Sequence, residues 1–176
     1  MTLIVADADG LIKLGKSGVL PLLLSATEIL VPAAVYEEAV RAGKKEMHED
    51  AFELERTLRD GGAEVVSDAE GGGGEVEELL KDASSLGAGE RGAFRILHAR
   101  GADAVLTDDR AFVNLLRRTQ TRVLLPAAAI VLLARSGRIA AEDAIAALGR
   151  IEHLVRRDVY EEARQELKGL IGEERR

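Results

Sequence analysis

The chain contains no cysteine or tryptophan, and aromatic residues make up only 3% of its 176 residues. Without cysteine it forms no disulfide, no thiolate metal site and no cysteine nucleophile, which is compatible with a reducing compartment. Apolar residues still make up 47% of the chain, so the core is expected to consist of Val, Leu, Ile and Ala. A chain of this length can bury such a core, and we expect residues 1–176 to form a single domain.

The sequence also lacks long apolar runs and an excess of positive charge. No stretch is long enough to span a membrane, and no basic segment followed by an apolar stretch and a cleavage site opens the chain. We therefore expect a cytoplasmic protein with no membrane partner. The net charge of −7 argues against a broadly basic nucleic-acid-binding surface. A local basic surface is compatible with it, because a metal site would consume several acids.

Short apolar runs alternate with helical patterns over the first 125 residues. The predicted strands cover residues 3–6, 28–31, 63–67, 104–107 and 122–125. The predicted helices cover residues 10–16, 19–25, 33–42, 45–59, 75–85, 88–100, 110–118, 127–135, 140–155 and 159–171. Gly71 to Gly74 are predicted to form a hinge. The alternation predicts an α/β fold, a three-layer α/β/α sandwich with a central parallel sheet over residues 1–125, and a helical C-terminal tail over 126–176.

Acidic residues stand at four positions where such a fold would gather them. Asp7 and the pair Asp108-Asp109 follow predicted strands, and Glu38 and Glu90 lie in the opening turns of predicted helices. In an open parallel sheet, ligands bind beyond the carboxyl ends of the strands, so both Asp positions face one crevice. Crowded carboxylates repel one another and take up protons unless a cation lies between them. The pattern therefore predicts a site for a hard divalent metal that serves phosphoryl chemistry.

Four segments resemble the sequence motifs of PIN domains, in the same order and spacing. Residues 7–12 resemble the opening Asp-x-x-x-Leu-Ile, and residues 31–38 resemble Val-Pro-x-x-Val-x-x-Glu. Residues 89–93 resemble the third motif, an acid that opens a helix, and residues 107–112 resemble Thr-x-Asp-x-x-Phe. The third acid is Glu90, where many members have Asp. The agreement covers roughly the first 125 residues, and the helical tail is similar to that of the VapC-related prokaryotic branch.

The resemblance implies dependence on Mg²⁺ or Mn²⁺ and endonuclease action on RNA. The implied catalytic residues are Asp7, Glu38, Glu90 and Asp109. The implied metal ligands are Asp7, Glu90, Asp108 and Asp109, with Asp7 as the central one. The residues expected on the substrate side are Thr107, Asp9 and Arg110. The doubled acid leaves open whether Asp108 or Asp109 contacts the metal, and the Thr-x-Asp spacing favours Asp109.

The similarity to VapC proteins further implies the toxin of a toxin–antitoxin pair, with an antitoxin protein as a partner. The tail helices carry more apolar surface than solubility needs, and part of it is expected to form the two-fold interface of a homodimer. The apolar tail residues are Ile130, Val131, Leu132, Leu133, Ile139, Ile145, Leu148, Ile151, Leu154 and Val155.

Other interpretations of the same residues stay open. Residues 7–11 also resemble the Asp-x-Asp-Gly-Thr motif of haloacid-dehalogenase-type phosphatases, in which Asp7 would be the nucleophile. However, Leu11 stands at the usual Thr position, and no late Lys precedes a Gly-Asp-x-x-x-Asp motif. A non-catalytic nucleic-acid or protein interaction module is a third interpretation. Taken singly, most of the acids could merely cap helices. Two groups of basic residues either line an RNA path or are solvated: Arg117, Arg118 and Arg122 form one group, and Lys13 and Lys16 form the other.

Overall fold

The computed structural model describes residues 2–67 and 73–174. They include a five-stranded sheet in which all strands are parallel, in the order β3-β2-β1-β4-β5. The strands are β1 (Leu3–Ala6), β2 (Glu28–Pro32), β3 (Glu64–Val66), β4 (Ala104–Leu106) and β5 (Arg122–Leu124). The predicted parallel sheet is confirmed, and β1 lies at its centre.

Alternate residues along each central strand enter two separate cores. Ile4 and Ala6 of β1 belong to one core, whereas Val5 belongs to the other. The strand period of two explains this division, because successive side chains point to opposite faces of a sheet. Both faces are buried, so these strands are apolar throughout rather than alternating, as is usual in parallel sheets.

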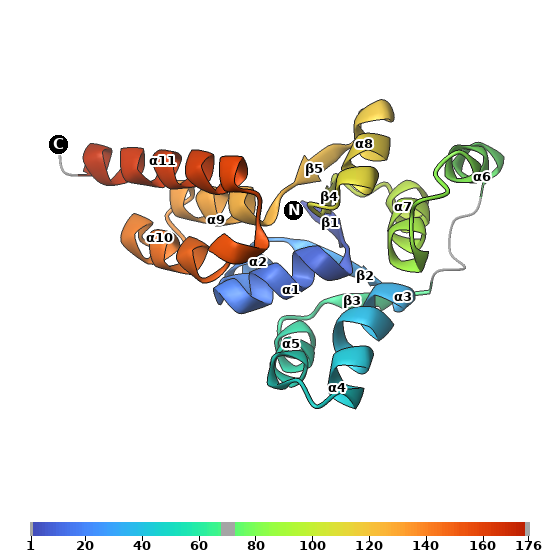
Figure 1. Cartoon of the computed structure of the whole chain (residues 1–176), viewed down its shortest axis with the longest axis horizontal. Helices are drawn as coiled ribbons and strands as arrows, with labels where there is room; N and C mark the ends of the chain where they lie inside the picture. Colours follow the sequence, from blue (N-terminus) through green and yellow to red (C-terminus); the bar gives the residue numbers. More distant parts are fainter. Residues whose placement is uncertain (1, 68–72, 175–176) are drawn as a thin grey trace.

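Helices cover both faces of the sheet, which confirms the predicted three-layer arrangement (Figure 1). The first face is covered by α1 (Ala8–Ser17), α2 (Leu20–Ala26), α5 (Glu49–Asp60), α9 (Pro126–Arg135), α10 (Ala141–Arg150) and α11 (Arg157–Glu174). The second face is covered by α6 (Gly74–Lys81), α7 (Ala88–Arg100) and α8 (Arg110–Arg118). No helix among the described residues is both long and apolar enough to cross a membrane.

The predicted helix over 33–42 changes its geometry part-way along. It begins as α3 (Ala33–Tyr36), becomes the π-helical segment η1 (Glu37–Ala42) and ends as α4 (Gly43–Lys45). The predicted helix over 45–59 is wrong at its start. Met47 adopts a left-handed conformation with φ of 59°, which interrupts the helix, and α5 begins only at Glu49. A π-helical segment has a wider turn than an α-helix and is frequent at functional sites.

Two other helices end earlier than predicted. The helix predicted over 75–85 ends at Lys81, and the Arg91 guanidinium donates to the carbonyl of Leu80 in its last turn and to those of Ala83 and Leu86 beyond it. Those carbonyls therefore need no further helical turn to be satisfied. The helix predicted over 140–155 ends at Arg150 and is followed by the short 3-10 segment η2 (Glu152–Leu154).

The predicted hinge lies partly outside the described residues. Gly71 and Gly72 belong to the segment 68–72, which the structure does not describe. Gly73 precedes α6 as its N-cap residue, and Gly74 is the first residue of that helix.

The C-terminal helices pack against α1 and α2 and share their core. The buried members of the apolar tail set are Ile130, Val131, Leu133, Leu148 and Ile151. Those partly buried against the same core are Ile139, Ile145, Leu154 and Val155. Leu132, which is 53% exposed, is the large exposed apolar residue of the set. The described tail therefore offers little apolar surface for a two-fold interface, and the homodimer stays a prediction without support from it.

Candidate functional site

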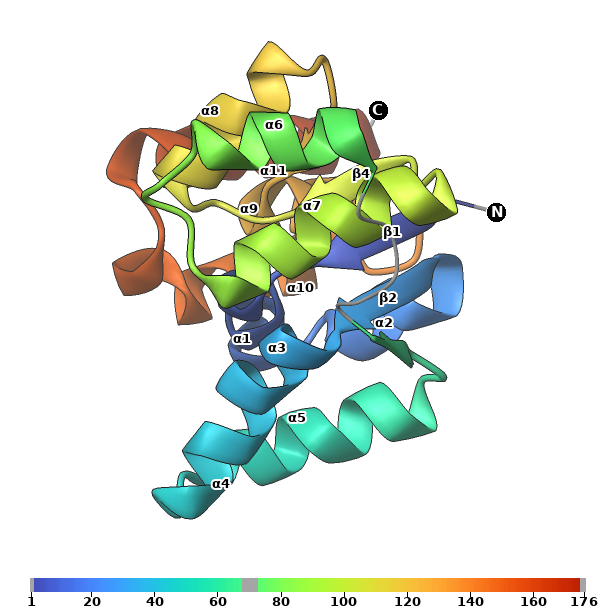
Figure 2. The same ribbon diagram turned by 90° about the vertical axis from the view of Figure 1, so that its right-hand side faces the viewer.

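The candidate site lies where β1 and β4 end, side by side at the centre of the sheet. Ala6 of β1 pairs with Leu106 of β4, and the Asp7 amide donates to the Leu106 carbonyl at 3.1 Å. The chain then turns directly into α1, whose start is tightly packed: a Cβ atom on Gly10 would lie 2.7 Å from the Leu106 carbonyl oxygen. Only glycine permits this approach. Figure 2 shows the first turns of α1, α3 and α7 near the same edge of the sheet.

Asp7 is a buried carboxylate, only 3% exposed. One of its oxygens caps α1 by accepting the Gly10 amide at 2.7 Å, and the other accepts the Thr107 hydroxyl. Burial raises its pKa to about 7, and the charges of Asp9 and Asp108 add to this, although the two hydrogen bonds oppose it. Within residues 2–67 and 73–174, no Lys or Arg contacts Asp7. Its negative charge is therefore poorly compensated by the protein.

A second group of acids is compensated, by Lys13 of α1. The Lys13 ammonium donates to Asp9 Oδ2 at 2.6 Å, and to Oδ1 and Oδ2 of Asp108 at 2.7 and 2.8 Å. Burial lowers the Lys13 pKa, but the hydrogen bonds that its ammonium donates to these carboxylates outweigh this effect, and the net pKa is raised. Burial and the neighbouring Asp9 raise the Asp108 pKa to about 6 despite Lys13.

Lys13 is the site residue that the sequence interpretation assigned wrongly, either to an RNA path or to solvent. One signal was available in the sequence: Lys13 follows Asp9 by four residues on a helix, a spacing that brings two side chains together. Its contact with Asp108 spans 95 positions along the chain and had no local signal.

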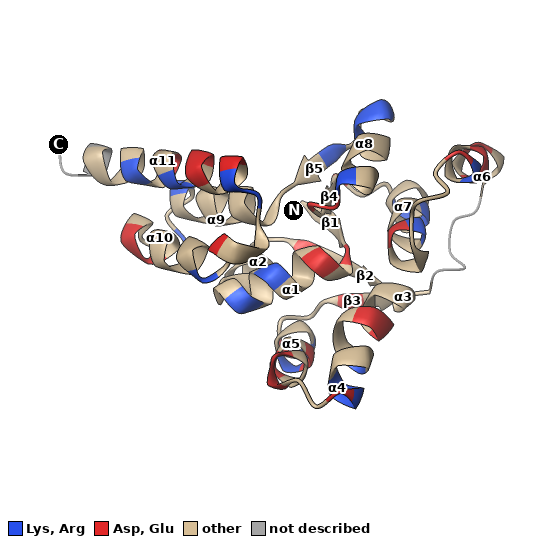
Figure 3. Ribbon diagram, viewed as in Figure 1, with Lys and Arg blue, Asp and Glu red and all other residues tan. Residues whose placement is uncertain are grey.

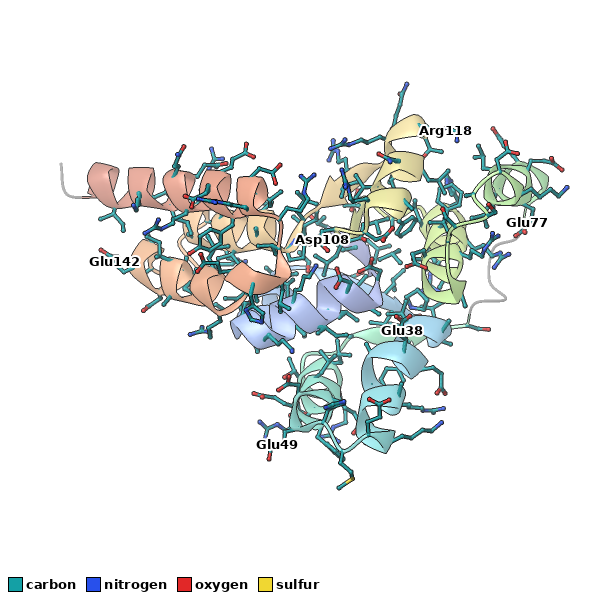
Figure 4. The ribbon with its side chains drawn as sticks, viewed as in Figure 1. Glu38, Glu49, Glu77, Asp108, Arg118 and Glu142 are labelled. Carbon is teal, nitrogen blue, oxygen red and sulfur yellow. The ribbon has the colours of Figure 1, made fainter. Side chains whose placement is uncertain are left out.

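Glu38 and Glu90 lie close enough for their charges to interact, and Glu38 is also near Asp9. Glu38 lies in η1, and its Oε2 would be 3.4 Å from a Cβ on Gly89, at the start of α7. Partial burial and the charges of Glu90 and Asp9 raise the Glu38 pKa. Glu90 is half-buried in the first turn of α7. Figure 4 shows Glu38 beside α3 and Asp108 near the end of β4, and Figure 3 shows acidic segments gathered around this centre.

Asp109 and Thr107 hold the loop that follows β4. Asp109 Oδ1 accepts the Phe112 amide at 2.8 Å and so caps α8, while its own amide donates to the Thr107 hydroxyl oxygen at 3.1 Å. Thr107 is fully buried, and its hydroxyl thus links Asp109 to Asp7. Arg110 is exposed at the first position of α8. The two adjacent acids thus differ: Asp108 accepts hydrogen bonds from Lys13, whereas Asp109 caps α8.

A PIN-domain family model matches residues 3–169 of the chain. The chain belongs to the PIN-domain family. The match includes the C-terminal helices as well as the α/β core, and it favours the PIN interpretation of Asp7 over the phosphatase one. Searches of curated proteins and of solved structures found no match. PIN domains are generally nucleases, which agrees with the acids that this PIN domain gathers at the carboxyl edge of its sheet.

The donor set of this PIN domain suits a hard cation in its chemistry, since it offers carboxylate oxygens from several elements. As the side chains lie, no three acids in the part of the chain that the structure describes come close enough to enclose an ion. The poorly compensated Asp7 carboxylate is the feature that fits a cation best.

The two basic groups considered from the sequence do not line a common path beside these acids. Arg117 and Arg118 end α8 and Arg122 begins β5, so all three lie toward the amino edge of the sheet. Figure 4 shows Arg118 at the far end of α8. Lys16 pairs with Asp50 at 3.3 Å.

A cavity of about 710 Å³ adjoins the acids at Glu38. It lies between α1, η1, α4, α5 and the end of α10, and Lys16, His48, Arg150 and His153 contribute to its wall. Its wall combines apolar segments with these basic groups and with four acids, Glu38, Glu46, Asp50 and Glu53.

Proposed function

We propose that this PIN domain is an endoribonuclease that depends on Mg²⁺ or Mn²⁺. The observation that carries the proposal is Asp7, a buried carboxylate near the charges of Asp9 and Asp108 that forms no ion pair with a Lys or Arg among the described residues. A bound divalent ion would orient and acidify a water molecule and offset the charge that develops on the phosphoryl oxygens. The protein's part is to hold the ligands and the RNA phosphate in place.

Asp7 is the central ligand in this proposal, because Gly10 and Thr107 fix both of its oxygens at the end of β1. Asp109 is the favoured ligand from β4, since its second oxygen accepts no hydrogen bond from the described residues, whereas both oxygens of Asp108 bind Lys13. Glu38 and Glu90 would supply further oxygens or hold water molecules. Asp108 and Asp9 would then not contact the metal and would bind Lys13 beside its ligands.

We propose single-stranded or looped RNA as the substrate. The cavity beside Glu38 is large enough to receive a nucleotide, and Lys16 and Arg150 on its wall could meet phosphates. Arg110 is exposed next to Asp109 and would contact RNA from the other side. Proteins read RNA sequence mainly in single-stranded regions, where bases are accessible. With few basic contacts, the dependence of binding on salt should be shallow.

The biological role that we propose is that of a VapC-like toxin, acting in the cytoplasm as a homodimer. An antitoxin protein would hold it inactive by placing an Arg or Lys against the acids, where charge-assisted hydrogen bonds are strong. The PIN family supports this role in general terms only. A small antitoxin gene in the neighbouring reading frame would support it directly.

The test is cleavage of matched substrates by the wild type and by Asp7→Asn. A hairpin RNA with a single-stranded loop, a fully paired RNA and duplex DNA are incubated with Mg²⁺, Mn²⁺ or EDTA. We expect cleavage of the looped RNA alone, only with metal, and its loss in Asp7→Asn. Asp143→Asn, an exposed acid on α10, is the matched control. Absence of both cleavage and metal binding in the wild type would favour the non-catalytic interaction module.

A further inference from the structure

Lys13 stands in the acid cluster in the manner of a bound cation. Its ammonium is held by three carboxylate oxygens from two residues, Asp9 in the first turn of α1 and Asp108 after β4. The side chain is only 10% exposed. Carboxylates of this kind, at the carboxyl edge of a parallel sheet, are the ligands that hard metal ions take in proteins.

These three hydrogen bonds use the full donor capacity of the ammonium, since a lysine offers three N–H groups. Lys13 thus has no donor left for an RNA phosphate unless one of these bonds breaks. Lys16, three residues later on the same helix, provides the contrast: its side chain is 38% exposed and it makes a single ion pair, at 3.3 Å, with the exposed Asp50. The two lysines therefore have different roles.

We propose that Lys13 is a built-in cation that takes the place of a second divalent ion in this chain. The inference rests on the proposed metal dependence of the site. Six carboxylates are enough ligands for two ions, as in nucleases that use two metals. Lys13 occupies Asp9 and Asp108, which leaves Asp7, Glu38, Glu90 and Asp109 for one ion. Lys13 is a positioning residue in this arrangement, because it holds the loop after β4 against α1.

Two consequences distinguish this role from that of an ordinary surface ion pair. Without Lys13, Asp9 and Asp108 would face each other with no compensating charge, and the fold should lose stability when no metal is present. The vacated pair of carboxylates should also accept a divalent ion, which would restore the lost stability. A surface lysine would show neither effect.

The experiment measures Mn²⁺ binding to the full chain by isothermal titration calorimetry, and melting temperature with EDTA or with excess Mn²⁺. The proteins are the wild type, Lys13→Met and the control Lys16→Met. We expect one Mn²⁺ per chain for the wild type and for Lys16→Met, and two for Lys13→Met. In EDTA, Lys13→Met should melt about 10 °C lower, and excess Mn²⁺ should recover most of that loss. Lys16→Met should melt within about 2 °C of the wild type.

A second variant keeps the test informative if Lys13→Met does not fold. Asp9→Asn combined with Lys13→Met removes one charge of each sign, so it should fold in EDTA and bind an additional Mn²⁺ through Asp108 with the low affinity of a single carboxylate. The proposal is overturned if the wild type already binds two ions, or if both variants that lack Lys13 keep the stoichiometry and affinity of the wild type.

The outcome also separates this proposal from the proposed function. A wild type that binds no Mn²⁺, beside a Lys13→Met variant that binds one, would refute the Asp7 metal site and support the role of Lys13. Equal binding of one ion by both would leave the metal-dependent nuclease standing and refute the role of Lys13. Absence of binding in every variant would refute both.

Discussion

Asp7 and Asp109 occupy the same local position after two neighbouring strands, yet their surroundings differ. Each caps the helix that follows it: Asp7 accepts the Gly10 amide at 2.7 Å, and Asp109 accepts the Phe112 amide at 2.8 Å. Asp7 is buried, and burial raises its pKa to about 7, whereas Asp109 is half-buried.

The comparison separates a local property from a tertiary one. A helix cap needs only a short polar side chain at the right place in the chain. The electrostatic cost at Asp7 comes from its position in the middle of the sheet, with the charges of Asp9 and Asp108 nearby. If Asp7 is a metal ligand as proposed, it should be catalytically important and destabilising at once, whereas Asp109 should stabilise the fold.

The largest expected effect is on cleavage. Asp7→Asn should lower RNA cleavage about 100-fold or more, because it removes the central metal ligand while it keeps the shape of the side chain. Single-turnover cleavage of looped RNA in Mn²⁺ measures this, with Asp143→Asn as the control. Retention of wild-type cleavage by Asp7→Asn would show that Asp7 is a helix cap and nothing more.

The next largest effect is a gain in stability in the same variant that loses cleavage. Without metal at pH 8, Asp7→Asn should raise the free energy of unfolding by on the order of 2 kcal/mol, because it removes a buried charge that is poorly compensated. Urea denaturation in EDTA measures it. Mg²⁺ should stabilise the wild type more than the variant. A marked loss of stability in Asp7→Asn would mean that the carboxylate itself is structural.

The stability difference should depend on pH. The folded pKa of Asp7, about 7, lies above the ordinary aspartate pKa of 3.8. Its contribution to stability is therefore fully present below about pH 4 and is lost as the pH rises through 7. The advantage of Asp7→Asn over the metal-free wild type should shrink steadily from pH 8 to pH 5. Denaturation of both proteins at several pH values tests this, and a difference that grows on acidification would contradict it.

The smallest effect concerns the cap alone. Asp109→Ala should lower the free energy of unfolding by about 1 kcal/mol in EDTA, since the amide of Phe112 loses its acceptor. Asp109→Asn keeps an acceptor and should recover most of this loss. Thermal melting of the two variants decides the matter. Equal stability of Asp109→Ala and the wild type would remove the contrast with Asp7.

The fold was largely predictable because its signals are local. The apolar runs at 3–6 and 104–107 predicted β1 and β4, and their order among helical patterns predicted a parallel sheet. The errors lie where a distant residue or an unusual backbone conformation decides. Arg91 donates to the carbonyls of Ala83 and Leu86 beyond α6, and the left-handed Met47 separates α4 from α5. Neither feature appears in hydrophobic periodicity.

The sequence by itself predicted the sheet, the helices that follow Asp7 and Asp109, and the membership of the PIN family. Each of these depends on neighbours along the chain. Only the tertiary structure decided which acids are compensated. Lys13 binds Asp108, which lies 95 positions away in the chain. Asp7 is buried near the charges of Asp9 and Asp108, and it forms no ion pair with a Lys or Arg among the described residues. Burial of Asp7 and the pairing of Lys13 with Asp108 arise from the packing of α1 against the end of β4, so no local pattern encodes them.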